Sequence, residues 1–100
     1  MKMLVISVFI VLQMSAQVVL SNDVFKGREV YVRDCVLCHG SSGEGRLPGL
    51  QSFNESQVLY RTDEALKKIV RDGKGVMPSF NGLLSDDDIR NVVTYLRTFL

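Results

Sequence analysis

Residues that commonly carry catalytic chemistry are scarce in this chain of 100 amino acids. The sequence has no tryptophan, two cysteines and a single histidine. A single imidazole excludes bis-histidine ligation of a metal within the chain, and no second histidine or pair of carboxylates is placed for acid–base catalysis. Two cysteines and one histidine also leave a zinc site without a convincing fourth ligand. The composition therefore argues against an enzyme with its own substrate site.

Neither sign of charge dominates the sequence. The chain carries 12 basic and 11 acidic residues, and from Asn22 onward the two counts are equal. A balanced chain gives no support for binding to nucleic acids. Four basic residues cluster shortly before Met77, and we interpret the cluster as a solvated helix face. These residues are Lys67, Lys68, Arg71 and Lys74.

The N-terminal segment is strongly apolar. Lys2 precedes an apolar stretch over residues 3–12, which is followed by a more polar zone over residues 13–21. This order of regions is typical of a secretory signal peptide. We therefore expect residues 1–21 to be a signal peptide with an uncertain cleavage site, and residues 22–100 to form one exported, periplasmic domain.

An uncleaved membrane anchor is the alternative interpretation of the same segment. Residues 3–20 are about as long as the roughly 18 residues that can just cross a bilayer. Gln13, Ser15 and Gln17 interrupt the apolar run and weaken this alternative.

Both cysteines and the histidine fall within the run Cys35-Val36-Leu37-Cys38-His39. A Cys-x-x-Cys-His run is typical of c-type haem attachment. Two thiols three positions apart lie on one face of a helical turn, from which they can form thioethers to the two vinyl groups of one porphyrin. The motif therefore predicts one haem c, covalently bound through Cys35 and Cys38, with His39 as an iron ligand.

Met77 is the natural second axial ligand of that iron. The other methionines, Met1, Met3 and Met14, lie in the segment that we expect to be removed. A thioether favours Fe(II), and His/Met ligation raises the reduction potential. The ligand pair predicts a carrier of single electrons that cycles between Fe(III) and Fe(II).

The apolar spacing predicts an all-α fold, and nothing in the sequence has the pattern of a strand. We expect a first helix over Asp23–Val36, because four of its residues, and one just beyond its end, recur at three- or four-residue steps on one face. These residues are Val24, Gly27, Tyr31, Cys35 and Cys38. The glycine- and serine-rich stretch over residues 40–50 is predicted to be a loop.

Three further helices are expected in the second half of the chain. Asn54 is predicted to cap a short helix to Tyr60, with Gln57 completing a capping box. The next helix begins at Thr62 or Asp63 and ends at Gly73. The last begins at Ser85 and carries a buried stripe. The stripe consists of Ile89, Val92, Val93, Leu96 and Leu100, widened by Tyr95 and Phe99.

From residue 23 to residue 100 the chain resembles a small bacterial class I cytochrome c. Three stretches carry the resemblance: residues 27–31 leading into the Cys35–Gly40 motif, the Leu47–Leu50 stretch, and residues 75–80 with the final amphipathic helix. The resemblance implies the cytochrome c fold, in which three to four helices and loops surround one covalently attached haem. It also implies redox proteins as electron donor and acceptor, docking transiently at the haem edge.

The resemblance assigns further roles in the haem pocket. It implies that the Pro48 carbonyl accepts a hydrogen bond from His39 Nδ1, that Leu50 and Phe80 pack on the porphyrin, and that Met77 is the distal ligand. It also implies that Gly27 and Tyr31 cross the terminal helix near Tyr95 and Leu96. This chain lacks the tryptophan that many relatives place near a haem propionate, and Tyr60, Arg46 or Arg61 could take its place.

Three other functions stay open at this point. A retained anchor would make the chain a membrane-tethered subunit of a respiratory or dehydrogenase complex. A labile sixth ligand would make it a haem enzyme or gas sensor. A thiol redox or zinc module would use Cys35 and Cys38 differently, but the sequence lacks the βαβ pattern of the first and the ligand set of the second.

Overall fold

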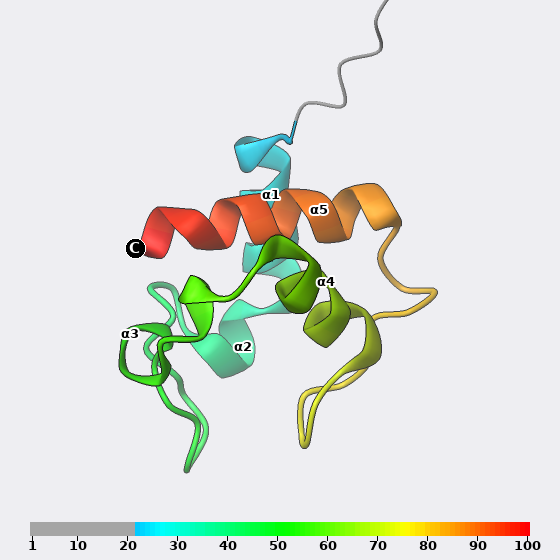
Figure 1. The fold of residues 1–100 in the computed structure, drawn as a ribbon. Coiled ribbons are helices and arrows are strands. Elements are labelled where there is room, and N and C mark those ends of the chain that lie inside the picture. Colours follow the sequence, from blue (N-terminus) through cyan, green and yellow to red (C-terminus); the bar gives the residue numbers. More distant parts are fainter. Residues whose placement is uncertain (1–21) are drawn as a thin grey trace, which may run out of the picture.

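The computed structural model describes residues 22–100, so the expected signal segment lies outside the described residues. The described part is helical, as predicted, and contains two isolated β-bridges but no strand (Figure 1). Its elements in order are α1 (Val24–Asp34), α2 (Val36–His39), α3 (Phe53–Ser56), η1 (Val58–Tyr60), α4 (Asp63–Asp72), α5 (Asp86–Leu96) and η2 (Arg97–Phe99). Within residues 22–100, no helix has the length and hydropathy needed to cross a membrane.

Helices α1 and α5 cross in close contact, with α5 lying across α1 in Figure 1. Gly27 makes the approach possible, because a Cβ at this position would lie 2.0 Å from the Asn91 carbonyl oxygen and 2.9 Å from Tyr95 Cβ. The Tyr31 and Tyr95 rings pack with centroids 5.4 Å apart. The predicted crossing of the first and last helices is therefore confirmed.

Helix α1 is shorter than the sequence predicted. It ends at Asp34, and Cys35 separates it from the short helix α2. Asp23 caps α1 because its side chain accepts from the backbone N–H groups of Phe25 and Lys26. The Cys35 backbone, at φ −121° and ψ −32°, interrupts the helix and redirects the chain into the turn that carries the attachment motif.

The prediction for residues 54–60 was wrong in detail. Ser52, not Asn54, is the N-cap of α3, and its side chain accepts from the Glu55 N–H. Gln57 does not complete a capping box; it adopts the left-handed conformation with φ +55°. That conformation ends α3 after one turn and starts η1.

The predicted caps of α4 and α5 are confirmed. The Thr62 hydroxyl accepts from the Ala65 N–H at the start of α4, and Gly73 follows its end. At the start of α5, Ser85 and Asp88 form a reciprocal capping box. Three aspartates in the first turn of α5 add favourable charge at the positive end of the helix dipole.

The hydrophobic core joins α1, α4 and α5. Its fully buried members include Tyr31, Leu59, Ile89, Val92 and Val93. Leu100, predicted to continue the α5 stripe, is 62% exposed. The α-helix gives way to the 3-10 helix η2 after Leu96, which changes the helical period and turns this last residue away from the core.

Candidate functional site

The predicted attachment motif forms the single turn of α2. The His39 N–H donates to the Cys35 carbonyl at 2.9 Å, and the Gly40 N–H donates to Val36 at 2.8 Å. The Tyr31 hydroxyl, from α1, donates to the Gly40 carbonyl at 2.5 Å and so ties the end of the motif to the core. The turn is therefore fixed at both of its ends.

Met77 lies on a tight turn that follows α4. The Lys74 N–H donates to the Met77 carbonyl at 3.1 Å, and the Met77 N–H donates back to the Lys74 carbonyl at 3.0 Å. Gly73 brings this turn against α4, since a Cβ there would lie 2.6 Å from the Met77 carbonyl oxygen and its φ is +77°. The Ser79 hydroxyl donates to the Arg71 carbonyl at 2.6 Å and holds the segment that follows the turn.

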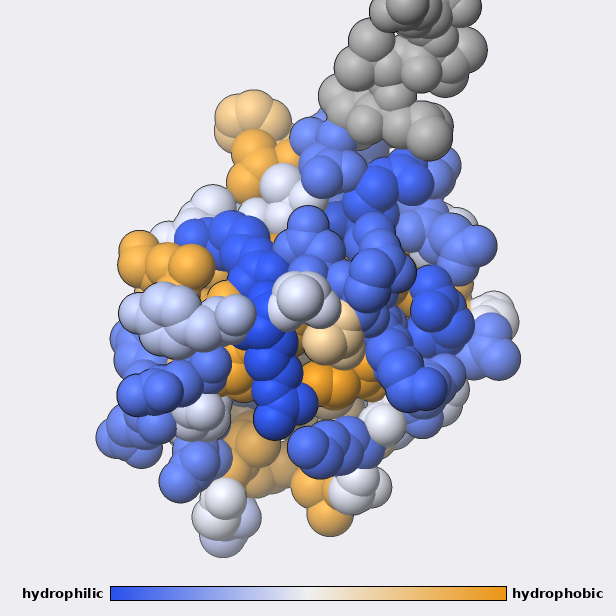
Figure 2. Space-filling model, in the orientation of Figure 1, coloured by the Kyte–Doolittle hydropathy of each residue, from blue (hydrophilic) through white to orange (hydrophobic). Residues whose placement is uncertain are grey.

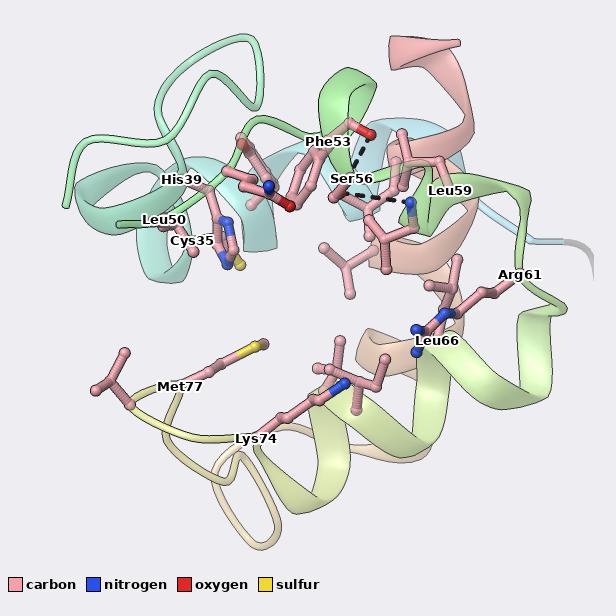
Figure 3. A pocket seen from close by; sticks show the side chains of 18 of the residues that line it. Cys35, His39, Leu50, Phe53, Ser56, Leu59, Arg61, Leu66, Lys74 and Met77 are labelled. Atoms are coloured by element: carbon pink, nitrogen blue, oxygen red, sulfur yellow. Dashed lines mark hydrogen bonds between the residues drawn. The ribbon is translucent and has the colours of Figure 1, made fainter. Parts of the chain in front are cut away.

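A cavity of about 520 Å³ lies between the α2 turn and the Met77 turn (Figure 3). Cys35, His39 and Met77 line it together with mostly apolar residues from α4 and α5. A second cavity of about 80 Å³ shares five of these lining residues and adds Cys38. The five shared residues are Cys35, His39, Leu50, Val76 and Met77. In Figure 2, apolar side chains are visible in the middle of the molecular face, framed by hydrophilic ones.

The His39 imidazole is held in an apolar environment. Its ring packs against Phe53, with centroids 4.9 Å apart and planes inclined at 32°. Burial lowers the pKa of His39, which favours the neutral imidazole that binds metals. Its Nδ1 atom is buried and has no hydrogen-bond partner among the residues that the structure describes. The Nδ1 hydrogen bond to Pro48 stays a prediction.

The Cys35 thiol is also sheltered. Burial, and then the nearby Asp34 carboxylate, raise the pKa of this thiol to about 11. Before attachment the thiol is therefore protonated at neutral pH. Cys38 lines only the smaller of the two cavities, on the same turn.

Of the other residues predicted to lie in the haem pocket, some line a cavity and one does not. Leu50 lines both cavities, and Phe80 lines the smaller one. Pro48 is exposed and lines neither cavity. Phe53, which the sequence did not single out, lines the larger cavity beside His39. Phe53 begins the one-turn helix α3, which is too short to give a periodic signal, so its position could not be predicted from the pattern.

Tyr60, Arg46 and Arg61 were the three candidates to replace the missing tryptophan near the haem. The structure distinguishes them by whether they line a cavity. Tyr60 is 78% exposed and lines neither cavity. Arg46 is also outside both cavities and faces Glu44 at 3.7 Å. Arg61 lines the larger cavity, and so does Lys74, which the sequence had assigned to a solvated helix face. The position of Lys74 three residues before Met77 is the sequence signal that could have placed it in the cavity.

The residues of the cleft fit a covalently attached haem. A volume of about 520 Å³ with predominantly apolar walls suits a large apolar cofactor. Two thiols, a neutral imidazole and a thioether all face this cleft or its smaller extension. The donor set of nitrogen and thioether sulfur matches the axial ligation of c-type cytochromes.

Comparisons with known proteins agree with this geometry. Residues 22–96 match the family model described as cytochrome c oxidase, cbb3-type, subunit III. Cytochrome c6 of Leptolyngbya boryana is 36% identical over 77 residues, which cover 74% of this chain and 89% of that protein. The crystal structure of cytochrome c6 from the diatom Phaeodactylum tricornutum matches with a TM-score of 0.63 and 29% identity, covering 78% of this chain and 99% of that one.

A longer relative matches over only part of its length. The cbb3-type cytochrome c oxidase subunit FixP of Bradyrhizobium diazoefficiens is 33% identical over 79 residues. The match covers 76% of this chain but 27% of FixP. The similarity therefore concerns about a quarter of that larger protein.

Proposed function

Because the chain belongs to the small class I monohaem cytochromes c, we propose that His39 and Met77 hold the iron of its one covalent haem c. Cys35 and Cys38 form the two thioethers in this proposal. The protein is an electron carrier. The bound haem supplies reversible Fe(III)/Fe(II) exchange of single electrons.

One observation carries the ligand assignment. The only histidine of the chain and the only methionine after residue 21 line the same two cavities, from turns that lie on opposite sides of the cleft (Figure 3). No other imidazole or thioether within residues 22–100 is present to replace either one. Both belong to turns fixed by backbone hydrogen bonds, so the ligand positions change little when the electron moves.

The surrounding side chains give the cleft mostly apolar walls. Phe53 packs on His39, and Leu50 lines both cavities. Leu66 and Val70 of α4 are buried and contribute the opposite wall. Apolar surroundings of a haem tune its reduction potential, together with the identity of the axial ligands.

We propose that the partners are redox proteins that dock over the smaller cavity. Val76 and Leu47 both line it, and these two residues are 87% and 41% exposed. A small apolar rim of this kind suits a weak, transient interface with fast exchange of partners. The chain has no need of a substrate site in this role and is proposed not to be an enzyme.

We propose that the protein is exported to the periplasm after removal of residues 1–21. The second candidate is a membrane-tethered subunit of an oxidoreductase, and the similarity to FixP together with the apolar residues 3–20 favours it. Mass spectrometry of the mature protein separates the two, because a retained anchor leaves the N-terminal segment on the chain.

Carbon monoxide tests the carrier function against a haem enzyme or gas sensor. A firmly bound Met77 leaves the reduced iron without an open position, so carbon monoxide should not change the spectrum of the reduced holoprotein. Rapid and complete carbon monoxide binding at neutral pH would show an open or labile sixth position and would favour the sensor or enzyme.

A further inference from the structure

Four basic side chains within residues 22–100 take part in no ion pair, whereas the other seven each face a carboxylate. Lys26 and Arg28 are exposed on α1, outside both cavities. Arg61 and Lys74 instead line the larger cavity. Of the four unpaired cations, therefore, only Arg61 and Lys74 face the cleft.

The larger cavity offers these two cations no negative partner. No aspartate or glutamate is among its lining residues, and Asp34 lines only the smaller cavity. In Figure 3 the side chains of Arg61 and Lys74 reach into the cavity, with their charged ends away from His39 and Cys35. Two exposed cations that line a mostly apolar cavity and have no carboxylate beside them there are placed to pair with an anionic group on the ligand that fills it.

The position of Arg61 is itself fixed from a distant part of the chain. The Arg97 guanidinium donates to the Arg61 carbonyl at 2.8 Å and to Asp63 Oδ1 at 2.6 Å. It also donates to the Leu59 carbonyl. Arg97 thus holds the segment between η1 and α4, from which Arg61 enters the cavity.

Lys74 is positioned by the turn that carries Met77. Its backbone exchanges two hydrogen bonds with Met77, at 3.1 and 3.0 Å, so the same turn sets the direction of both side chains. One cation therefore enters the cavity with the segment after η1, and the other enters with the Met77 turn.

We propose that Arg61 and Lys74 bind the two carboxylates of the haem. The proposal rests on haem c filling the cleft, as in the proposed function. In this chain a cationic pair takes the place that an aromatic N–H donor has in relatives with a tryptophan. Charge-assisted contacts of this kind are stronger than neutral ones and fix the orientation of the bound group.

The test is the pH profile of the reduction potential, measured by spectroelectrochemistry on the holoprotein at low salt. A carboxyl near the iron binds its proton more tightly when the iron is reduced, so the potential falls with rising pH across the titration of that carboxyl. A cation in contact with the carboxylate lowers its pKa and moves this fall to lower pH. Removing the cation should therefore move it to higher pH.

The variants are Arg61→Gln and Lys74→Gln, with Lys26→Gln and Arg28→Gln as matched controls that also remove an unpaired cation. We expect each cavity variant to move the fall in potential upward by about 1 pH unit. We expect Arg61→Lys to move it less than Arg61→Gln, and the two controls to leave it in place. Arg61 and Lys74 are exposed, so these variants are expected to fold.

Cavity variants whose pH profiles coincide with those of the controls would overturn the proposal. The optical spectrum of the native holoprotein keeps this failure distinct from a failure of the proposed function. A spectrum that is not low-spin contradicts the His39/Met77 ligation, whereas a low-spin spectrum with unmoved profiles contradicts only the role of the two cations.

Discussion

A Cβ placed on Gly27 would lie 2.0 Å from the carbonyl oxygen of Asn91, so α1 and α5 meet backbone to backbone. The contact is reinforced on α5, where the Asn91 side chain is buried and accepts from the Asp23 N–H at 2.9 Å. Because α1 leads directly into the attachment motif and α5 covers the cleft, this crossing sets the position of both walls relative to each other (Figure 1).

Gly27→Ala should destabilise the holoprotein by about 2 kcal/mol, because the added methyl group meets a backbone atom that cannot rotate away. Denaturant unfolding measures the loss. Lys26→Ala, one residue earlier on the exposed side of α1, is the control and should change stability by less than about 0.5 kcal/mol. If Gly27→Ala is instead more stable, helix propensity decides at this position and the close crossing is wrong.

Tyr31→Phe should cost about 1–2 kcal/mol, because it leaves the Gly40 carbonyl at the end of the haem-attachment turn without its donor. The Tyr31 side chain is 1% exposed, so water cannot replace the hydroxyl. Thermal unfolding of the holoprotein at neutral pH measures the effect. Tyr60→Phe, at an exposed position, should be neutral; equal losses in the two variants would contradict the role of the hydrogen bond.

Tyr31 also predicts a dependence of stability on alkaline pH. Burial raises the pKa of Tyr31 above its ordinary value of 10.0. The unfolded chain therefore loses this proton at a pH where the folded protein retains it, and stability falls as the pH rises above about 10. Tyr31→Phe should show a shallower decline than the native protein over that range. Parallel declines would show that other groups carry the effect.

Arg97→Gln should lower the free energy of unfolding by about 2 kcal/mol, because one guanidinium serves two backbone carbonyls and the Asp63 carboxylate. Urea unfolding measures the change. Arg33→Gln, which removes an exposed pair with the adjacent Asp34, is the matched control and should cost little. A loss no larger than that of the control would show that Arg97 does not hold the segment between η1 and α4.

The sequence predicted the parts of the fold that local chemistry determines. The sequence predicts helix boundaries at Ser85 and Gly73, and a start of α4 at Thr62 or Asp63, because capping depends on a few neighbouring residues. Gln57 was not identified as a break, because a left-handed conformation at a residue other than glycine has no clear local signal. Leu100 was misplaced because periodicity assumes one helical repeat, and the chain changes to a 3-10 helix before it.

In the candidate site, too, some residues could be predicted from local sequence and others could not. The run from Cys35 to His39 predicts a haem from spacing alone. The convergence of Arg61 and Lys74 on one cavity depends instead on contacts that sequence order does not reveal. Arg97 contacts Arg61 across 36 positions of the chain, and no local pattern predicts that pairing.

The central claim is that His39 and Met77 ligate the same iron, and the most direct measurement compares the native holoprotein with Met77→Ala by optical spectroscopy and redox titration. The account predicts a low-spin native spectrum and a substitution that abolishes it, lowers the reduction potential and opens the reduced iron to carbon monoxide. A Met77→Ala protein that keeps the native low-spin spectrum and the native potential would contradict the account.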